Sequence, residues 1–113
     1  MTYKEYLAYV EEAKNCETAV EVRIEYGFPP DCEWTGDGLA EAFDIIFAVS
    51  REDVAELVRI SKLKQSVFAR KFNIPLRNMQ RWTAATRVAP AYVIQLIGFA
   101  MLTDCEKAEF IQI

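Results

Sequence analysis

Arg77, Gln80 and Arg81 are the side chains in this sequence best suited to contacting a nucleic acid. Gln80 and Arg81 follow Arg77 by three and four positions, so all three share one face if residues 75–85 form a helix. In the DNA major groove, Arg can donate two hydrogen bonds to guanine O6 and N7, and Gln can pair with N6 and N7 of adenine. Leu76, at the start of the same segment, could contact a thymine methyl group. The spacing therefore predicts a helix face that reads bases.

Other side chains around this segment are better suited to the phosphate backbone, which fixes the register of a protein on DNA without reading sequence. Lys64 and Arg87 lie before and after the predicted base-reading helix and are expected to contact phosphates. Gln65 begins the preceding predicted helix and could direct its amide and the helix N-terminus toward a phosphate. Arg70 and Lys71 lie around the same face or behind it.

The charge of the chain is divided unevenly between its two halves. Residues 1–57 carry fourteen acidic and four basic residues, a net charge of −10, whereas residues 58–113 carry nine basic and three acidic residues, a net charge of +6. Eight of the basic residues lie between Leu57 and Thr103, where the sequence has no Asp or Glu. Clustered Lys and Arg displace counterions from phosphate whatever the charge of the whole chain. This distribution favours nucleic acid as a partner although the chain has a net charge of −4.

The elements that must position these residues are short helices. Apolar periodicity and breaking residues predict four of them in the second half, at about 51–62, 65–72, 75–85 and 90–102. Ser50 and Asp53 form a capping pattern ahead of the first helix. Pro75 and Pro90 suit the first turns of the third and fourth helices, where a missing N–H costs nothing.

The link between the second and third of these helices predicts a tight turn. Asn73 is the non-glycine residue that best tolerates a left-handed conformation, so we expect it in the turn. Apolar residues on both sides of this turn are predicted to pack into the core: Phe68, Ala69, Phe72, Met79 and Trp82.

The segment Gln65–Trp82 resembles the helix-turn-helix of the phage repressor and Cro type, also called the xenobiotic-response-element family. The positions that match the family pattern are Gln65, Phe68, Ala69, Ile74, Met79 and Trp82. The apolar run after Val88 is similar to the closing helix of that family. The resemblance implies a bundle of four or five helices over residues 51–103 that binds double-stranded DNA, usually as a homodimer on a palindromic site. It places Gln65 at a phosphate or base contact, and it places four residues on the recognition face: Leu76, Arg77, Gln80 and Arg81.

Three positions at which the family pattern has glycine carry other residues in this chain. Lys62 begins a Lys-Leu-Lys sequence in place of Gly-Leu-Ser, Asn73 occupies the turn, and Ala85 ends a Thr-Ala-Ala sequence in place of Glu, a spacer and Gly. The first change adds positive charge on the side expected to face DNA. The last changes the loop that follows Trp82.

The N-terminal half predicts helices of a more acidic character. Thr2 can cap a helix over residues 3–14, and an apolar helical pattern runs through residues 39–49. Between them, residues 18–26 alternate as a strand would, but no second strand is evident to pair with, so a helix is favoured and a strand is the alternative. Pro and Gly concentrate between residues 27 and 38, which marks a loop. The last five residues, 109–113, also alternate and suggest a short strand.

Composition disfavours several classes of function. The three widely spaced cysteines, Cys16, Cys32 and Cys105, and the absence of histidine predict neither a disulfide framework nor a zinc site, and we expect no cofactor. Without histidine or a glycine-rich phosphate loop, we do not expect an enzyme. The uncharged run Val88–Thr103 is shorter than the roughly 20 residues that span a bilayer, which favours a buried helix and no membrane contact. The polar N-terminal sequence lacks an export signal, so we expect a cytoplasmic protein.

These patterns predict an all-α protein with three parts: an acidic helical N-terminal region over 1–48, a helix-turn-helix DNA-binding domain over 51–103, and a C-terminal tail over 104–113. The expected function is sequence-specific binding of double-stranded DNA by a small bacterial or phage repressor that occludes a promoter. The alternative is a protein-interaction module, such as an antitoxin-like or inhibitor protein, whose acidic half binds a basic partner protein.

Overall fold

A computed structural model describes residues 1–27 and 36–105 of the chain. Within these residues every regular element is a helix, and no strand occurs. The elements are α1 (Tyr3–Ala13), α2 (Ala19–Tyr26), α3 (Gly36–Ser50), α4 (Val54–Ser61), α5 (Gln65–Lys71), α6 (Leu76–Thr83) and α7 (Ala91–Cys105). The all-α prediction is confirmed, and the ambiguous segment 18–26 is helical. The suggested strand at 109–113 lies outside the described residues.

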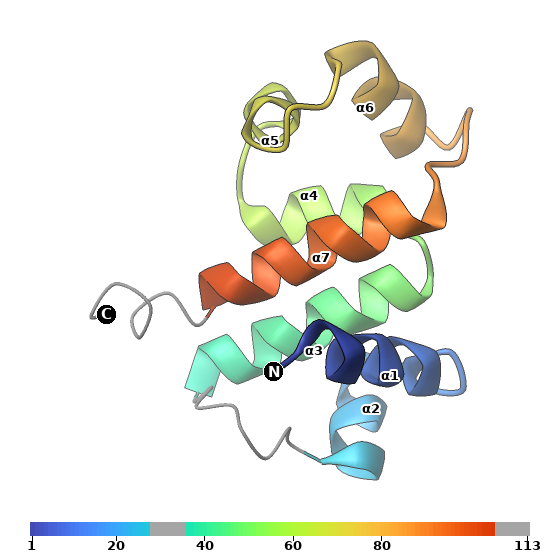
Figure 1. Cartoon of the computed structure of the whole chain (residues 1–113), viewed down its shortest axis with the longest axis vertical. Helices are drawn as coiled ribbons and strands as arrows, with labels where there is room; N and C mark the ends of the chain where they lie inside the picture. The colour runs from blue at the N-terminus through green and yellow to red at the C-terminus, as the bar shows by residue number, and fades with distance from the viewer. Residues whose placement is uncertain (28–35, 106–113) are drawn as a thin grey trace.

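Helix α3 lies at the centre of the arrangement and contacts α1, α2, α4 and α7. In Figure 1, α1 and α2 lie on one side of α3, α7 and α4 lie on the other, and α5 with α6 form the far end of the molecule. Phe43, Ile45 and Ile46 of α3 are fully buried and belong to the same core cluster as Ile94 and Ile97 of α7. A single core therefore joins the acidic and the basic parts of the sequence. The predicted boundary between these parts, at residues 48–51, lies where α3 ends and the next turn begins.

The first helix begins where the sequence predicts. Thr2 Oγ1 accepts a hydrogen bond from Glu5 N at 3.1 Å, and the Glu5 carboxylate accepts one from Thr2 N at 3.3 Å. This reciprocal capping box satisfies two N–H groups that have no partner within the helix. Tyr6, Val10 and Ala13 are buried on the inner face of α1.

The turn between α3 and α4 corrects one prediction. Ser50 does not cap the next helix: it is the last residue of α3, and its hydroxyl donates to Phe47 O at 2.5 Å. Asp53 is the N-cap instead, and its carboxylate accepts a hydrogen bond from Glu56 N at 3.1 Å. The apolar pattern of α3 continues through Val49, so α3 extends to Ser50 and the chain reverses over the next three residues. Glu52 takes a left-handed φ of 53° in that turn, and α4 begins at Val54 rather than near residue 51.

Arg51 ties this turn to the end of α1. Its guanidinium donates to Ala13 O at 3.2 Å and to Cys16 O, and it lies 4.4 Å from the ring centroid of Phe47. A cation at the C-terminal end of a helix is favourable because the last carbonyls carry partial negative charge. The contact therefore holds the acidic N-terminal helices against the turn that leads into α4.

Gly98 of α7 lies where this helix approaches α1 and α3 closely. A Cβ atom at this position would lie 2.5 Å from Tyr6 Oη and would also overlap Cγ2 of Val49. The fully buried Tyr6 hydroxyl donates to Gln95 O at 2.7 Å, so α1 is hydrogen-bonded to α7 one turn away. Burial and the neighbouring Tyr3 raise the pKa of Tyr6 far above its ordinary value.

Among the described residues, no helix is both long enough and apolar enough to cross a membrane.

Candidate nucleic-acid interface

Helices α5 and α6 pack on each other and rest on the core through a few apolar side chains. Phe68 and Ala69 of α5 and Met79 of α6 are buried, as the sequence predicts. Phe72 and Trp82 are only partly buried, but both pack against the same core. The phenyl rings of Phe68 and Phe72 lie 4.8 Å apart between centroids. These contacts fix the inner faces of the two helices and leave their polar faces outside.

The link between α5 and α6 has the conformation that its sequence predicts. Asn73 has a left-handed φ of 54°. Its N–H donates to Arg70 O at 3.2 Å, and Ile74 N donates to Ala69 O at 2.8 Å. These are the two hydrogen bonds of a Schellman motif, which closes a helix when the residue after its cap is left-handed. The motif ends α5 and lets α6 begin three residues later.

The outer face of α6 carries the predicted base-contact residues. Arg77 and Gln80 are exposed, Leu76 is 42% exposed and Arg81 is half-buried. Because Met79 points into the core, residues two positions before it and one or two after it are turned outward. The helix spans Leu76–Thr83 rather than 75–85, with Pro75 as its N-cap residue and Ala84 as its C-cap residue. The shorter helix still contains all four residues.

The end of α6 repeats the closing motif of α5. Thr86 N donates to Arg81 O at 3.0 Å, Ala85 N donates to Trp82 O at 3.2 Å, and Ala85 takes a φ of 59°. The carbonyl of Arg81 also accepts from Arg87 N at 3.3 Å. The exposed Arg87 is thereby held directly beyond the last turn of α6, close to Arg81 in space.

Lys62 closes α4 in the same backbone conformation. Its φ is 61°, and its N–H donates to Arg59 O at 3.1 Å. Lys62, Asn73 and Ala85 thus occupy the left-handed region, where glycine is the default residue because it has no Cβ to clash. Each of the three positions ends a helix or begins the link that follows it.

Gln65 is directed toward α6. Its side-chain amide donates a hydrogen bond to Thr83 Oγ1, and the Thr83 hydroxyl lies 3.1 Å from Met79 O and 3.2 Å from Gln80 O as possible acceptors. This side-chain amide of Gln65 is the group predicted from the sequence to contact a phosphate. The sequence gives no local sign of Thr83 as a partner, because the two residues lie 18 positions apart. Lys64, the N-cap residue of α5, makes no side-chain capping bond and is exposed.

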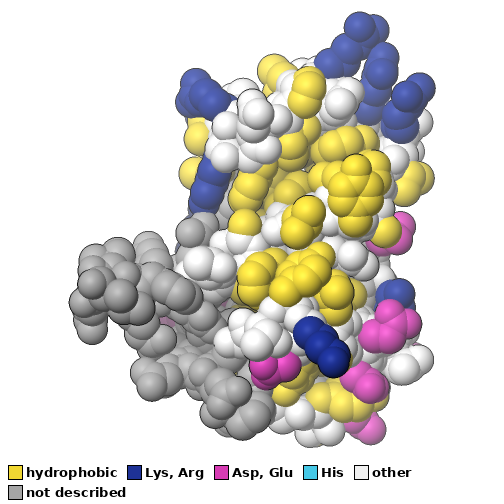
Figure 2. All heavy atoms as spheres, in the orientation of Figure 1, with side chains coloured by type: hydrophobic (Ala, Val, Ile, Leu, Met, Phe, Trp, Pro, Cys, Tyr) yellow, Lys and Arg dark blue, Asp and Glu magenta, His cyan; other side chains and the backbone are white. Residues whose placement is uncertain are grey.

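The surface over α5 and α6 is positively charged. Figure 2 shows Lys and Arg side chains at the end of the molecule formed by these helices, and acidic side chains toward the opposite end. Two ion pairs of the described residues, Lys14–Glu11 and Arg59–Glu56, lie outside the segment 62–87. Among the described residues, Arg77, Arg81 and Arg87 form no ion pair with an acidic side chain, and Arg77 and Arg87 are exposed to solvent.

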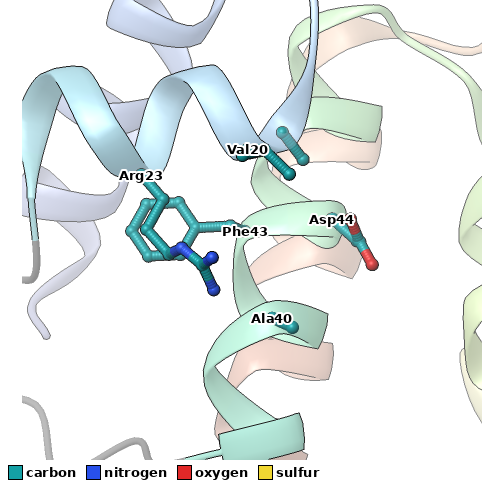
Figure 3. Close-up of a pocket in the computed structure, with 6 residues that line it drawn as sticks. Val20, Arg23, Ala40, Phe43 and Asp44 are labelled. Carbon is teal, nitrogen blue, oxygen red and sulfur yellow. The ribbon is translucent and has the colours of Figure 1, made fainter.

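Two hollows of the described surface lie away from α5 and α6. A shallow pocket between α2 and α3 is lined by Val20 and Arg23 on one side and by Ala40, Phe43 and Asp44 on the other (Figure 3). Burial raises the pKa of Asp44, and the positive charges of Arg59 and Arg23 offset part of this rise. A second hollow lies between α3 and α4 and is lined by both acidic and basic residues. The predicted DNA-contact residues line neither of these two hollows.

Comparisons of the sequence and structure with protein-family models, curated proteins and solved structures found no match.

Proposed function

We propose that this chain binds double-stranded DNA in a sequence-specific manner through the outer face of α6, as a small transcriptional repressor that occludes a promoter. The observation that carries the proposal is the outward-facing set Arg77, Gln80 and Arg81, of which the first two are exposed and Arg81 is half-buried, on a helix whose opposite face is fixed in the core by the fully buried Met79. Such a helix can enter the major groove without rearranging the protein. No Asp or Glu in the sequence between Leu57 and Thr103 opposes its approach to phosphate.

The backbone supports the helix-turn-helix interpretation of this region. Lys62, Asn73 and Ala85 stand at the three positions where the repressor and Cro pattern has glycine, and all three are left-handed. A left-handed conformation costs a residue other than glycine about 1 kcal/mol. The chain thus keeps the conformations of those positions although it lacks their residue type. This agreement is independent of the six matching residues on which the sequence resemblance rests.

The proposed contacts divide into two kinds. Arg77, Gln80 and Arg81 would read base edges, with Leu76 available to a thymine methyl group. The exposed residues Lys64, which precedes α5, and Arg87, which follows α6, would neutralise phosphates. The amide of Gln65 donates one hydrogen bond to Thr83, and its second N–H is available to a phosphate.

The salt dependence of binding tests the proposal. Each neutralised phosphate contributes about −0.9 to the slope of log K against log salt concentration, so affinity for duplex should fall steeply between about 50 and 200 mM salt. Fluorescence anisotropy with random duplex, and with duplex selected from a random pool, measures both affinity and preference. If no duplex binds even at low salt, the proposal fails.

A second candidate function is favoured by α2. Val20 and Ile24 lie one helical turn apart and are 56% and 77% exposed, and the acidic residues Glu21 and Glu25 follow each of them directly. An exposed apolar row with acidic neighbours suits a protein partner that presents apolar and basic side chains. In that case the chain is an interaction module of the antitoxin-like or inhibitor kind. Absence of duplex binding at low salt would favour this candidate over the first.

A further inference from the structure

The hollow between α3 and α4 has charged walls of opposite sign. Its volume is about 270 Å³, close to the lower end of the range of roughly 300–1,000 Å³ that small-molecule sites occupy. Acidic side chains line its α3 side, basic side chains line its α4 side, and Ala40 and Ile60 add apolar surface. The charged residues are Asp37, Glu41 and Asp44 on α3, Arg59 on α4 and Lys62 directly after it. We call this feature the α3–α4 hollow, and its size suits a small molecule.

Most charges of the α3–α4 hollow are unpaired. Within the described part of the chain, the side chains of Asp37, Asp44 and Lys62 form no ion pair and no hydrogen bond. Arg59 donates to Glu56 from Nε and from one terminal nitrogen, and its second terminal nitrogen makes no bond to a described residue. A ligand can therefore meet acceptors on one wall and donors on the other without breaking an existing bond.

Asp44 is placed to meet a positive group in this hollow. Its carboxylate points away from α2 and from Arg23 (Figure 3). Asp37 and Glu41 precede Asp44 by seven and three positions, so the three carboxylates share one face of α3, where like charges at such spacings repel. An ammonium group among them offsets this repulsion. The desolvation that raises the pKa of Asp44 also strengthens its attraction to such a group, because water then screens the two charges less.

We propose that the α3–α4 hollow binds a small zwitterion with an amine at one end of a short aliphatic chain and a carboxylate at the other. The ammonium group of this ligand donates to the carboxylates of Asp37 and Asp44. Its carboxylate accepts from Lys62 and from the unpaired terminal nitrogen of Arg59.

The two walls explain why the ligand needs both groups and a chain between them. Packed helices lie about 8–10 Å apart between their axes, and each charged group must reach a different helix. A ligand with a single charge leaves one wall unpaired and meets like charge there. The site lies on α3 and α4, so its occupancy does not depend on the proposed DNA binding and is measured without nucleic acid.

Amide chemical shifts of the isotope-labelled full chain test the inference, with ε-aminocaproate as the probe. Its addition should shift the amide signals of residues 37–44 and 59–62. Hexylamine and caproate share its carbon chain, and each lacks one of its two charged groups. Because either molecule loses the charge-assisted hydrogen bonds of one end, ε-aminocaproate should bind about tenfold more tightly than each of them.

Two variants assign the ends of the ligand. Asp44→Asn should lower the affinity for ε-aminocaproate to that for caproate, because the ammonium group then loses its charged partner. Lys62→Gln should lower it to that for hexylamine. Glu17→Gln is the matched control, since it changes an exposed carboxylate outside the hollow and should leave the affinity unchanged.

Thermal unfolding verifies that the three variants fold, as expected for exposed positions. Three results would overturn the inference. The first is the absence of shifts in the hollow at about 10 mM ε-aminocaproate, above the millimolar Kd of a weakly bound small ligand. The second is binding of hexylamine or caproate as tight as that of ε-aminocaproate. The third is wild-type affinity in Asp44→Asn or in Lys62→Gln.

Discussion

The side-chain amide of Gln65 donates a hydrogen bond to the hydroxyl of Thr83, which joins the first residue of α5 to the last residue of α6. Both side chains are half-buried, so water competes only in part for the same bond. The turn at Asn73 joins the near ends of the two helices, and this hydrogen bond joins their far ends. Together they set the angle at which the outer face of α6 is presented.

A double-mutant cycle on Gln65→Ala and Thr83→Val measures the energy of this bond. Each single substitution should lower the free energy of unfolding by about 0.5–1.5 kcal/mol, the usual net value of a hydrogen bond. The double mutant should lose less than the sum, because the second substitution removes a bond already broken. Urea unfolding supplies all four values. Strict additivity would show that the two side chains are not coupled.

Substitutions on α6 should separate base reading from phosphate binding. Arg77→Ala and Arg81→Ala are each expected to cost about 1–3 kcal/mol on a selected duplex and to relax preference at particular base pairs. Lys64→Ala should weaken binding to all sequences alike and reduce the salt slope by about 1. Competition binding with selected and random duplexes measures both effects. Equal losses on the two kinds of duplex in the Arg77 variant would mean that the α6 face does not read sequence.

Ala85→Gly should stabilise the protein. Ala85 has a φ of 59°, and a glycine there would relieve a left-handed strain of about 1 kcal/mol at a small entropic cost. Ala84→Gly is the matched control, since Ala84 has a right-handed φ of −81° and gains nothing from the change. Thermal unfolding should therefore shift upward for the first variant and not for the second. A lower midpoint for Ala85→Gly would contradict the described closure of α6.

Gly98→Ala should destabilise the protein even though alanine favours helices over glycine by about 1 kcal/mol. The added methyl group would overlap Tyr6 Oη and Val49 Cγ2, and overpacking of this kind costs about 1–3 kcal/mol. Denaturant unfolding measures the net effect. The same substitution made in a Tyr6→Phe background should cost less, because one of the two obstructing atoms is then absent. An equal cost in both backgrounds would exclude Tyr6 as the obstruction.

Stability should decline in alkaline solution through Tyr6. Burial, and then the neighbouring Tyr3, raise the pKa of Tyr6 in the folded chain above the value of about 10 expected when the chain is unfolded. Above that pH the unfolded chain loses the proton while the folded chain keeps it, so the stabilisation present below pH 10 is lost as pH rises. Urea unfolding at several pH values should show this decline. Tyr6→Phe should flatten it, and an unchanged slope would assign the decline to other groups.

The features that sequence alone predicts here are local ones. Thr2 predicts a helix start, and Asn73 predicts a left-handed turn by its own side chain. Ser50 shows the limit of local signals. Its capping pattern predicts the start of a helix, but the apolar pattern of α3 extends to it, and Ser50 is the last residue of α3. In physical terms, burial of Val49 in the core decides where α3 ends.

Features that depend on pairing across the fold lie beyond local patterns. The bond between Gln65 and Thr83 and the close contact at Gly98 each join residues that are far apart in sequence. The backbone conformation of Lys62 and Ala85 is also unexpected from their side chains, since neither residue favours a positive φ. The apolar and polar faces of α6 were predictable, because they follow from residue types at helical spacing within one segment.

Helix α3 contacts helices from both the acidic and the basic parts of the chain. Two segments of opposite charge therefore share one folding equilibrium, and the chain should melt in a single transition. Division of the chain at residue 50 would leave half of the buried apolar cluster on each fragment. Neither fragment would then have a complete core. A molecule that binds α1 and α2 only in the folded chain stabilises the folded state as a whole. It therefore also raises the fraction of molecules in which α6 is folded and able to bind its own partner.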